Sequence, residues 1–529
     1  MRHYTKRNSL LFTFTVLLSA LLIIIINILS AHKNYGLEGD EVFSYISSTS
    51  MGGYKGICYL KDQTWYNAHY FEDALTATGK ECFNYKMVVD NQAMDTHPPF
   101  YYILLNTIAS FFSGQFSRWY GIGLNIFLML FVWGGLFLLL QFFIDEKYLS
   151  IIFSTLFCCS RFSVNMVLFI RMYVLLMALC IFQTWFHLKL YKQMSENEYF
   201  TISKYIKQYL LLVLITILGA YSHYYFIIYQ CLISALFVCA LCFQKRYHNS
   251  LSYTCSMLCS AILYIILYPA ALNHIFFKYR GRDAIHKFLK GSSLLSEFNS
   301  MLTQYNQQVF KGALFPLIIV LGSITIFLII TKQIKPRSLL RYIAYVMPSF
   351  IYFFGISKSS PFVTIRYISP VAAIIFTAIV VWVIKLIKYI IPEKRKILSY
   401  IFISLLFLLI TVYFGQIPIK DSFFSEKRNI IQTMAKETNC CLYISGDSYN
   451  WKMWEDYIYY PEFDKLFFID GTKTNPITDL EVNTLKQATI FIDTALDKEQ
   501  IINYLKRYLS FKNYSLVYTT PYTYIILAE

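Results

Sequence analysis

The sequence predicts a polytopic α-helical membrane protein that ends in a small α/β domain. Hydrophobic residues make up 57% of its 529 residues and charged residues only 15%, whereas soluble domains carry about 25% charged residues. The apolar residues fall in runs of about 20, the length that crosses the hydrocarbon core of a bilayer. After residue 415 these runs stop, and short β-rich segments alternate with polar helical ones. A water-soluble enzyme is therefore excluded.

The net charge of +16 is interpreted as membrane topology, and no nucleic-acid partner is expected. In a chain this apolar, lysine and arginine collect in loops held on the cytoplasmic face. Eight of the twelve cysteines lie inside apolar runs, where a thiol behaves as a small hydrophobe. Cys58 and Cys82 lie in the first long polar loop and can pair if that loop is extracytoplasmic, while Cys440 and Cys441 are a less favoured adjacent pair.

The first apolar run, residues 9–30, follows Arg2, Lys6 and Arg7. Its 22 residues exceed the apolar stretch of a signal peptide, which is about 7–15 residues long. We therefore expect a retained anchor with its basic N-terminal flank inside. This orientation places residues 31–97, which carry nine acids and five lysines, outside.

Eleven crossings are predicted in all, and the odd number places the C-terminus outside. After the first, they are residues 119–143, 148–165, 170–190, 206–222, 224–243, 251–272, 312–331, 339–357, 364–388 and 397–415. Residues 98–113 are interpreted as an interfacial helix instead, because counting them as a crossing would place the basic linkers 332–341 and 385–396 outside.

Two domains follow from this pattern. Residues 1–415 form the membrane domain, in which 31–118 is an outer loop with the interfacial helix. Residues 416–529 form a soluble α/β domain at the outer face, without a glycine-rich phosphate loop or a nucleophile elbow. We interpret it as a lid or an acceptor-docking module. Its expected strands are 441–445, 465–470, 488–493, 515–520 and 522–529, and its expected helices 424–436 and 498–509.

Ionisable groups near a membrane are costly, so each is a candidate functional residue. All the candidate clusters fall on the predicted outer face. Asp40-Glu41 follows the first span and is either a solvated turn or a catalytic carboxylate pair. A second cluster either starts the interfacial helix with its prolines or contributes a functional histidine. It reads Asp95-Thr96-His97-Pro98-Pro99-Phe100-Tyr101-Tyr102.

Several cations stand at the edges of spans, where arginine either anchors the helix in the interface or binds a ligand. These residues are Arg118, Arg171 in the motif Arg171-Met172-Tyr173, His223 in His223-Tyr224 and Arg366 in Arg366-Tyr367. The predicted outer loop 273–311 is unexpectedly basic, with Lys278, Arg280, Arg282, Lys287 and Lys290. These residues bind either anionic lipid headgroups or a phosphate carried on a lipid.

Together the clusters offer the chemistry of transfer from a lipid-linked phosphate. A carboxylate takes the proton from an acceptor hydroxyl, cations stabilise the departing phosphate, and apolar spans hold the lipid tail. A lipid flippase or secondary transporter is the alternative, since it also has many spans and intramembrane charges. However, the sequence has no internal repeat, and its distinctive charges gather at one predicted face.

The ordered set of motifs resembles the C-type membrane glycosyltransferases that use polyprenyl-phosphate sugars. These include protein O-mannosyltransferases, the aminoarabinose transferase of lipid A and Rgt-type lipopolysaccharide glycosyltransferases. The matching motifs cover residues 1–390. They are Asp40-Glu41, His97-Pro98-Pro99-Phe100-Tyr101-Tyr102, Arg118, Arg171-Met172-Tyr173, His223-Tyr224 and Arg366-Tyr367-Ile368-Ser369-Pro370.

The resemblance implies an inverting hexosyl or pentosyl transferase in which Asp40 is the general base and Glu41 orients it or the acceptor. His97, Arg118, Arg171 and Arg366 would bind the donor phosphate or shape its pocket, beside Tyr101, Tyr102, Tyr173, His223, Tyr224 and Tyr367. Many relatives carry a glutamate where this chain has Phe169. Phosphate binding by Lys278, Arg280 and Arg282 is inferred from charge placement alone.

The expected partners are a polyprenyl-phosphate-linked sugar, membrane lipids, and an acceptor hydroxyl on a glycan, a lipid-linked saccharide or a protein. No cofactor is expected, and the sequence offers no obvious metal cage. Low charge and high aromatic and isoleucine content favour a bacterial inner membrane.

Overall fold

A computed structural model describes most of the chain. The described ranges are 2–33, 36–53, 60–67, 69–196, 202–290, 294–334, 336–360, 362–391, 421–446, 451–473 and 475–529, with the single residues 401 and 405. In these ranges seven helices are long and apolar enough to cross a membrane, or nine if two bent pairs each count as one span. The predicted class, a helical integral membrane protein with a C-terminal sheet domain, is confirmed.

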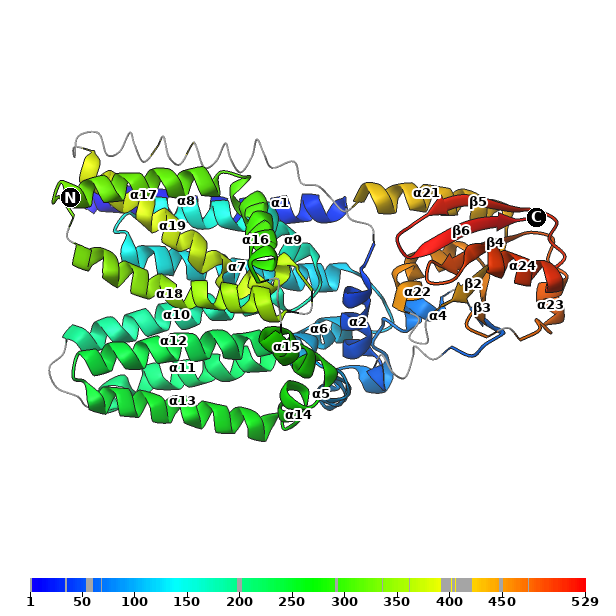
Figure 1. The fold of residues 1–529 in the computed structure, drawn as a ribbon, viewed down its shortest axis with the longest axis horizontal. Helices are drawn as coiled ribbons and strands as arrows, with labels where there is room; N and C mark the ends of the chain where they lie inside the picture. The colour runs from blue at the N-terminus through cyan, green and yellow to red at the C-terminus, as the bar shows by residue number, and fades with distance from the viewer. Residues whose placement is uncertain are drawn as a thin grey trace. The chain divides into compact units, whose positions relative to one another are not determined.

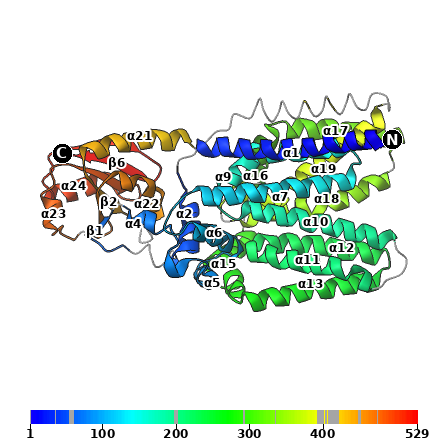
Figure 2. The same ribbon diagram turned by 180° about the vertical axis from the view of Figure 1, so that it is seen from behind.

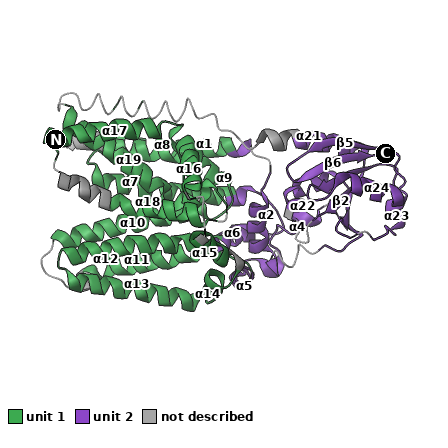
Figure 3. Cartoon of the chain, viewed as in Figure 1, with its two compact units in different colours: residues 1–30, 95–101, 122–417 green, residues 31–94, 102–121, 418–529 purple. Residues whose placement is uncertain are grey.

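The chain divides into two compact units (Figure 3). Unit 1 holds residues 1–30, 95–101 and 122–417, and unit 2 holds residues 31–94, 102–121 and 418–529. Three helices run across the divisions along the chain: α1 (Arg2–His32), α6 (Phe100–Phe111) and α7 (Trp119–Phe143).

The other described elements of unit 1 are helical. They are α8 (Lys147–Cys158), α9 (Arg161–Leu168), α10 (Tyr173–Glu196), α11 (Ile202–Ser222), α12 (Tyr224–Phe243), α13 (Tyr247–Leu267), α14 (Ala270–Phe276), α15 (Tyr279–Lys290), α16 (Leu294–Tyr305), the π-helical turn η2 (Asn306–Phe310), α17 (Leu314–Ile330), α18 (Pro336–Ser359), the 3₁₀ turn η3 (Ile365–Ile368) and α19 (Ser369–Ile390).

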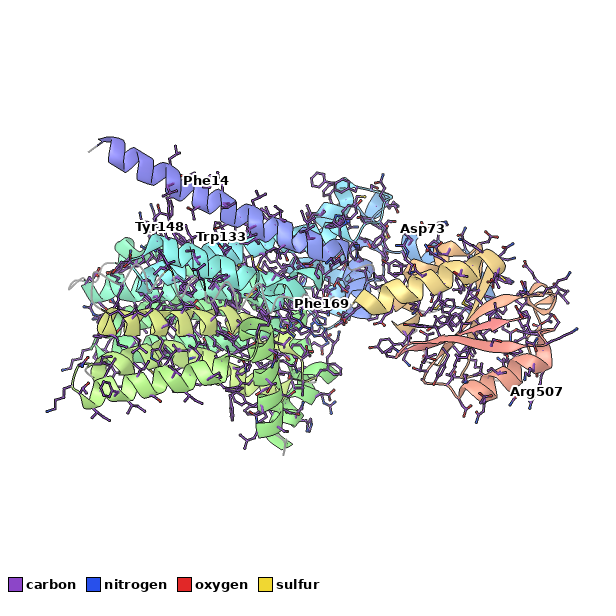
Figure 4. The ribbon with its side chains drawn as sticks, turned by 90° about the horizontal axis from the view of Figure 1, so that it is seen from above. Phe14, Asp73, Trp133, Tyr148, Phe169 and Arg507 are labelled. Carbon is purple, nitrogen blue, oxygen red and sulfur yellow. The ribbon has the colours of Figure 1, made fainter. Side chains whose placement is uncertain are left out.

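Helices α10, α11, α12 and α13 lie side by side in unit 1 (Figures 1 and 2), and α10 also packs against α19. Burial distinguishes the centre of the unit from its periphery. In the span that ends with α19, 89% of the most apolar window is buried, against 17% in α1. Phe14 of α1 is 61% exposed (Figure 4), as expected for a helix whose apolar side chains face lipid.

The predicted crossings 119–143 and 224–243 coincide with α7 and α12. The crossing predicted at 148–165 covers the pair α8 and α9, which meet at an angle of 55° and so are not one continuous helix. The break has a local cause: the Ser160 hydroxyl accepts a hydrogen bond from the Ser163 amide at 3.3 Å and so starts a new helix. The crossing expected at 251–272 ends at Leu267, and Pro269 precedes α14.

Two further expectations concern the number of crossings. The apolar stretch 98–113 forms the short helix α6, whose 12 residues span about 18 Å at 1.5 Å per residue, less than the hydrocarbon core. The crossing expected at 397–415 lies outside the described residues, apart from 401 and 405. The total of eleven crossings therefore stays a prediction.

Unit 2 contains a six-stranded sheet in the order β1-β3-β2-β4-β6-β5. The strands are β1 (Thr64–Asn67), β2 (Cys440–Ser445), β3 (Lys465–Asp470), β4 (Ala488–Asp493), β5 (Tyr514–Thr519) and β6 (Thr523–Ala528). β2 is parallel to β3 and β4, and the other neighbouring pairs are antiparallel. All five strands expected after residue 440 are confirmed.

The helices of unit 2 are α2 (Gly39–Thr49), α4 (Tyr70–Asp73), η1 (Gly79–Glu81), α5 (Tyr85–Met94), α21 (Asp421–Glu437), α22 (Trp451–Glu455), η4 (Tyr457–Glu462), α23 (Leu480–Asn483) and α24 (Lys498–Tyr508). One face of the sheet packs on α23 and α24 through Leu442, Ile490, Val482 and Leu505. The other face packs through Tyr443 and Phe491 against Tyr460 of η4. This alternation follows from the two-residue period of side chains along a strand.

The sequence did not predict β1, which comes from the polar loop before residue 97 and pairs with β3. Four residues are too few for a recognisable alternating pattern, so tertiary pairing decides their structure. In the same loop Cys58 lies outside the described residues, so the pairing of Cys58 with Cys82 stays a prediction. Cys440 and Cys441 are buried free thiols.

Candidate functional site

The candidate residues fall into two groups, one in each unit, and each group is described by itself. The group in unit 1 is built at helix ends. It draws on the turn at 95–99, the break between α9 and α10, the start of α12, the residues between α14 and α15, and η3 before α19. Helix termini expose backbone donors and acceptors that lack intrahelical partners, so polar side chains gather there.

Asp95, His97 and Arg171 form a hydrogen-bonded chain. His97 Nδ1 lies 3.0 Å from Asp95 Oδ2, and His97 Nε2 lies 3.3 Å from an Arg171 terminal nitrogen. Because arginine only donates, Nε2 accepts and the imidazole proton resides on Nδ1, which donates to Asp95. His97 is therefore neutral in this arrangement and orients Arg171.

The charge of Asp95 is stabilised by this chain. Burial by itself would raise the pKa of its carboxyl, but the hydrogen bond from His97 and the positive charge of Arg171 outweigh burial. The pKa of Asp95 consequently lies well below its usual value. The carboxylate stays ionised at neutral pH and keeps the His97 proton on Nδ1.

The guanidinium of Arg366 contacts two aromatic rings. The Thr364 hydroxyl accepts a hydrogen bond from the Arg366 amide at 3.4 Å and starts η3. The Arg366 guanidinium carbon lies 5.1 Å from the ring centroid of Phe169 and 5.5 Å from that of Tyr367. Phe169 in turn stacks on Tyr173 at 5.9 Å. Phe169, which stands where many members of the resembled family carry a glutamate, thus supports Arg366 by a cation–π contact.

His223 precedes α12 and caps it. Its Nδ1 accepts a hydrogen bond from the Tyr225 amide at 3.0 Å, which leaves the imidazole proton on Nε2. Its ring centroid lies 6.2 Å from that of His97 and 5.8 Å from that of Tyr173. A neutral N–H donor is thereby placed among the groups that hold Arg171 and Arg366.

Lys278 joins the group through His274. Its ammonium donates to the Asp95 carbonyl oxygen and lies 3.3 Å from His274 Nε2. His274 Nδ1 lies 2.6 Å from the Tyr224 hydroxyl, and the Tyr268 hydroxyl donates to the His97 carbonyl at 3.3 Å. The structure therefore gathers eight of the predicted residues: His97, Arg171, Tyr173, His223, Tyr224, Lys278, Arg366 and Tyr367.

The other candidates in unit 1 are placed differently. Tyr101 is fully buried and donates to Asn125 at 3.1 Å, while Asn125 donates to the carbonyls of Val167 and Phe169. Tyr101 thus supports the break that carries Arg171. Arg282 is exposed on α15, and the side chain of Arg280 is not described.

Sequence reasoning missed Asn125, His274 and Tyr268. Asn125 had a signal, since it is a polar residue inside the apolar run of α7. His274 and Tyr268 belong to no motif and had none.

The group in unit 2 centres on α2, whose first turn carries Asp40 and Glu41. Glu41 is 4% exposed, and its carboxylate accepts a hydrogen bond from the Glu38 amide at 2.7 Å. The Glu38 carboxylate accepts in return from the Glu41 amide, which completes a capping box. Glu41 therefore fixes the start of the helix, and Asp40 is the partly exposed carboxylate beside it.

The remaining two candidates are also in unit 2. Arg118 donates to the Ala31 carbonyl at 2.9 Å and lies 5.8 Å from the Trp119 ring centroid. This geometry suits the anchoring role that arginine plays at span edges. Tyr102 is fully buried. Within the described residues, no three His, Cys, Asp or Glu side chains are grouped closely enough to hold a metal ion.

Neither a protein-family model nor a curated protein sequence matches this chain. Solved structures do. ArnT from Cupriavidus metallidurans bound to undecaprenyl phosphate matches with a TM-score of 0.50 and 11% identity over 97% of each chain. Its apo state matches with the same TM-score and 12% identity over 97% of this chain and 98% of that one. The Archaeoglobus fulgidus oligosaccharyltransferase matches with a TM-score of 0.48 and 12% identity over 96% and 72%.

At these identities the likeness concerns the fold. The chain has the fold of ArnT, and so the expected resemblance to the C-type membrane glycosyltransferases is confirmed at the level of fold. A fold hosts several activities, so the function has to be argued from the site.

Proposed function

We propose that this protein transfers a sugar from a polyprenyl-phosphate donor to an acceptor hydroxyl at the outer face of the membrane, with inversion at the anomeric carbon. One observation carries the proposal: the cation-rich group of unit 1, in a chain with the fold of ArnT, whose structure was solved with undecaprenyl phosphate bound. The proposed location is a bacterial inner membrane, with the N-terminus cytoplasmic and the C-terminal domain extracytoplasmic.

The donor phosphate is assigned to Arg171 and Arg366. Both present guanidinium groups, which bind phosphate through paired hydrogen bonds. Arg171 is held by His97 at 3.3 Å and Arg366 by the Phe169 ring at 5.1 Å, so little ordering remains when the donor binds. His223 and Lys278 add a neutral and a charged donor to the same group.

Asp40 is assigned the role of general base toward the acceptor hydroxyl. The carboxylate removes the proton of this hydroxyl while the acceptor oxygen attacks the anomeric carbon and forms the new glycosidic bond. The bond from that carbon to the phosphate oxygen breaks, and its electron pair leaves with the polyprenyl phosphate. The arginines stabilise the charge that develops on this leaving group.

The donor is hexosyl or pentosyl, and the acceptor is a glycan, a lipid-linked saccharide or a protein hydroxyl. Purified wild-type protein and Asp40→Asn are to be incubated with radiolabelled polyprenyl-phosphate sugars and a membrane extract. We expect transfer by the wild type and a loss of about 10²- to 10⁴-fold in the variant, the usual contribution of a general base.

Asp90→Asn is the matched control, because Asp90 is an exposed acid of α5 that pairs with Lys86 at 2.9 Å. It should transfer at the wild-type rate. Equal transfer by wild type and Asp40→Asn would remove Asp40 as the base. Transfer by neither, from protein that melts cooperatively, would favour the flippase or transporter alternative.

A further inference from the structure

We propose that the C-terminal sheet domain positions the helix that carries Asp40, and that Glu455 is the positioning residue. This inference rests on the proposed function for the role of Asp40. It assigns to the domain a task other than that of a separate lid or docking module. All the residues involved belong to unit 2.

The direct contact joins segments that are 416 residues apart. Glu455 Oε1 accepts a hydrogen bond from the Gly39 amide at 3.1 Å. Gly39 is the first residue of α2, and the first amides of a helix have no intrahelical acceptor. The capping box of Glu38 and Glu41 satisfies other amides of this turn, and Glu455 satisfies that of Gly39. Because Asp40 is the next residue, fixing Gly39 fixes the backbone of Asp40.

Glu455 is itself held on both sides. Trp454 is fully buried and packs edge-on against Phe71 at 4.9 Å between ring centroids. Asp456 forms a buried ion pair with Lys427 and accepts a hydrogen bond from the Thr523 hydroxyl at 2.9 Å. With a core aromatic before it and a buried pair after it, the backbone of Glu455 has one well-defined position.

A second contact holds α2 one turn further along. Tyr45 packs against Phe116 at 5.1 Å, and Phe116 packs against Tyr457 at 5.7 Å. The Tyr45 hydroxyl donates to the Ser117 carbonyl at 2.9 Å and accepts from the Gly121 amide at 3.0 Å. The domain thus contacts the start of α2 directly through Glu455 and reaches its middle through the packing of Tyr457 on Phe116. Strand β1 of the same loop is part of the domain's sheet.

The first test is kinetic and uses the full-length protein. Glu455→Ala removes the acceptor of the Gly39 amide, and a displacement of a catalytic group by about 1 Å costs about 10²-fold in rate. We expect kcat to fall about 10- to 100-fold, with the KM for the polyprenyl-phosphate donor within about twofold of wild type. Glu455→Gln keeps an oxygen acceptor and should recover kcat to within about threefold.

The control is Glu462→Ala. Glu462 is an exposed acid of the neighbouring turn η4 that accepts a hydrogen bond from Gln432 at 2.9 Å, and its loss should leave kcat unchanged. If Glu455→Ala lost activity through misfolding, its yield and melting temperature would fall together with kcat. Glu455→Gln would then not restore kcat. A kcat for Glu455→Ala within twofold of wild type overturns the inference.

The second test does not depend on activity and separates this inference from the proposed function. Hydrogen exchange of the peptide 36–45 is to be measured in wild type, Glu455→Ala and Glu462→Ala. We expect the Gly39 amide to exchange about tenfold faster in Glu455→Ala only, as follows from losing a charge-assisted hydrogen bond. Unchanged exchange overturns the positioning role, even if Asp40 is the base. Faster exchange in a protein without transferase activity overturns the proposed function and leaves the positioning contact intact.

Discussion

The two units gather their candidate residues by different routes. In unit 1, cations and histidines lie at the ends of successive helices, and most of them occur in short motifs such as Arg171-Met172-Tyr173. In unit 2, Asp40 lies on a short helix whose first amide is held by Glu455, 416 residues away. The arrangement in unit 1 depends on helix packing. The arrangement in unit 2 depends on a sheet in which β1, from the loop before residue 97, pairs with β3 of the C-terminal domain.

This difference has an energetic consequence. A helix of unit 1 satisfies its own backbone in the membrane, so a single substitution at its end alters ligand contacts more than folding. The helix α2 has only 11 residues, too few to be stable alone. Its position therefore depends on tertiary contacts, and substitutions in unit 2 should alter stability first.

The largest expected effect tests the stability of unit 2. Phe71 is fully buried and its ring centroid lies 4.9 Å from those of both Trp454 and Tyr460. Truncating such a residue costs about 3–5 kcal/mol, so Phe71→Ala should lower the melting temperature of unit 2 by about 10 °C. Thermal unfolding in detergent, followed by near-UV circular dichroism, measures this.

Leu480→Ala is the control for Phe71, because Leu480 in the same unit is 81% exposed. It should melt within about 1 °C of wild type. Equal melting temperatures for Phe71→Ala and wild type would mean that the polar loop does not stabilise the sheet.

The next effect concerns donor binding in unit 1. Arg171→Ala removes a cation oriented by His97 and should weaken undecaprenyl phosphate binding by about 10- to 100-fold, the value of a charge-assisted contact. Arg282→Ala, an exposed arginine of α15, should change binding less than about threefold. Competition of undecaprenyl phosphate against a labelled donor measures both. Equal losses of affinity in Arg171→Ala and Arg282→Ala would indicate that the phosphate contacts the basic loop 273–311 as a whole and does not bind specifically at Arg171.

Much of the fold was predictable because its signals are local. Apolar runs gave α7 and α12, and β-rich runs gave the five strands after residue 440. The bend at Ser160 was not predicted, because one serine inside an apolar run does not reveal whether its hydroxyl caps a new helix. Strand β1 was not predicted, because its pairing partner β3 lies about 400 residues further along the chain.

The site was predictable to a similar degree. The motifs identified most of the residues that meet in unit 1, but they did not assign roles among them. His97 was expected to bind the donor phosphate or to shape its pocket, and its hydrogen bonds favour the second role, through orientation of Arg171. Glu41 was expected to orient the base or acceptor, and its carboxylate is part of a capping box. Such roles depend on hydrogen-bond partners that no sequence spacing specifies.

A smaller effect separates these two roles of His97. His97→Gln places an amide oxygen near the position of Nε2, which accepts from Arg171, whereas His97→Asn imitates only the Nδ1–H donor to Asp95. We expect donor affinity to fall about tenfold in His97→Asn and about threefold or less in His97→Gln. Equal losses in the two variants would indicate that His97 contacts the phosphate as a cation.

The smallest effect concerns the charge of Asp95. The pKa of this carboxyl lies below its usual value in the folded protein, since His97 and Arg171 favour the ionised form against the opposing effect of burial. A depressed pKa stabilises the fold above the unfolded-state pKa of about 3.9, and this stabilisation is lost as the pH falls through the folded-state pKa. Because the Asp95 side chain is 46% exposed, solvent screens most of the interaction.

Asp95→Asn should therefore melt about 1–2 °C below wild type near neutral pH. The difference should shrink as the pH falls below about 4, because the carboxyl of the unfolded wild type then binds a proton while that of the folded protein is still ionised. The amide introduced by this substitution still offers an oxygen to His97, so the pH-dependent part of the difference measures the carboxylate charge alone. A difference that stays constant down to about pH 3 would assign the role of Asp95 to its hydrogen-bond geometry, and the orientation of Arg171 would then not depend on an ionised partner.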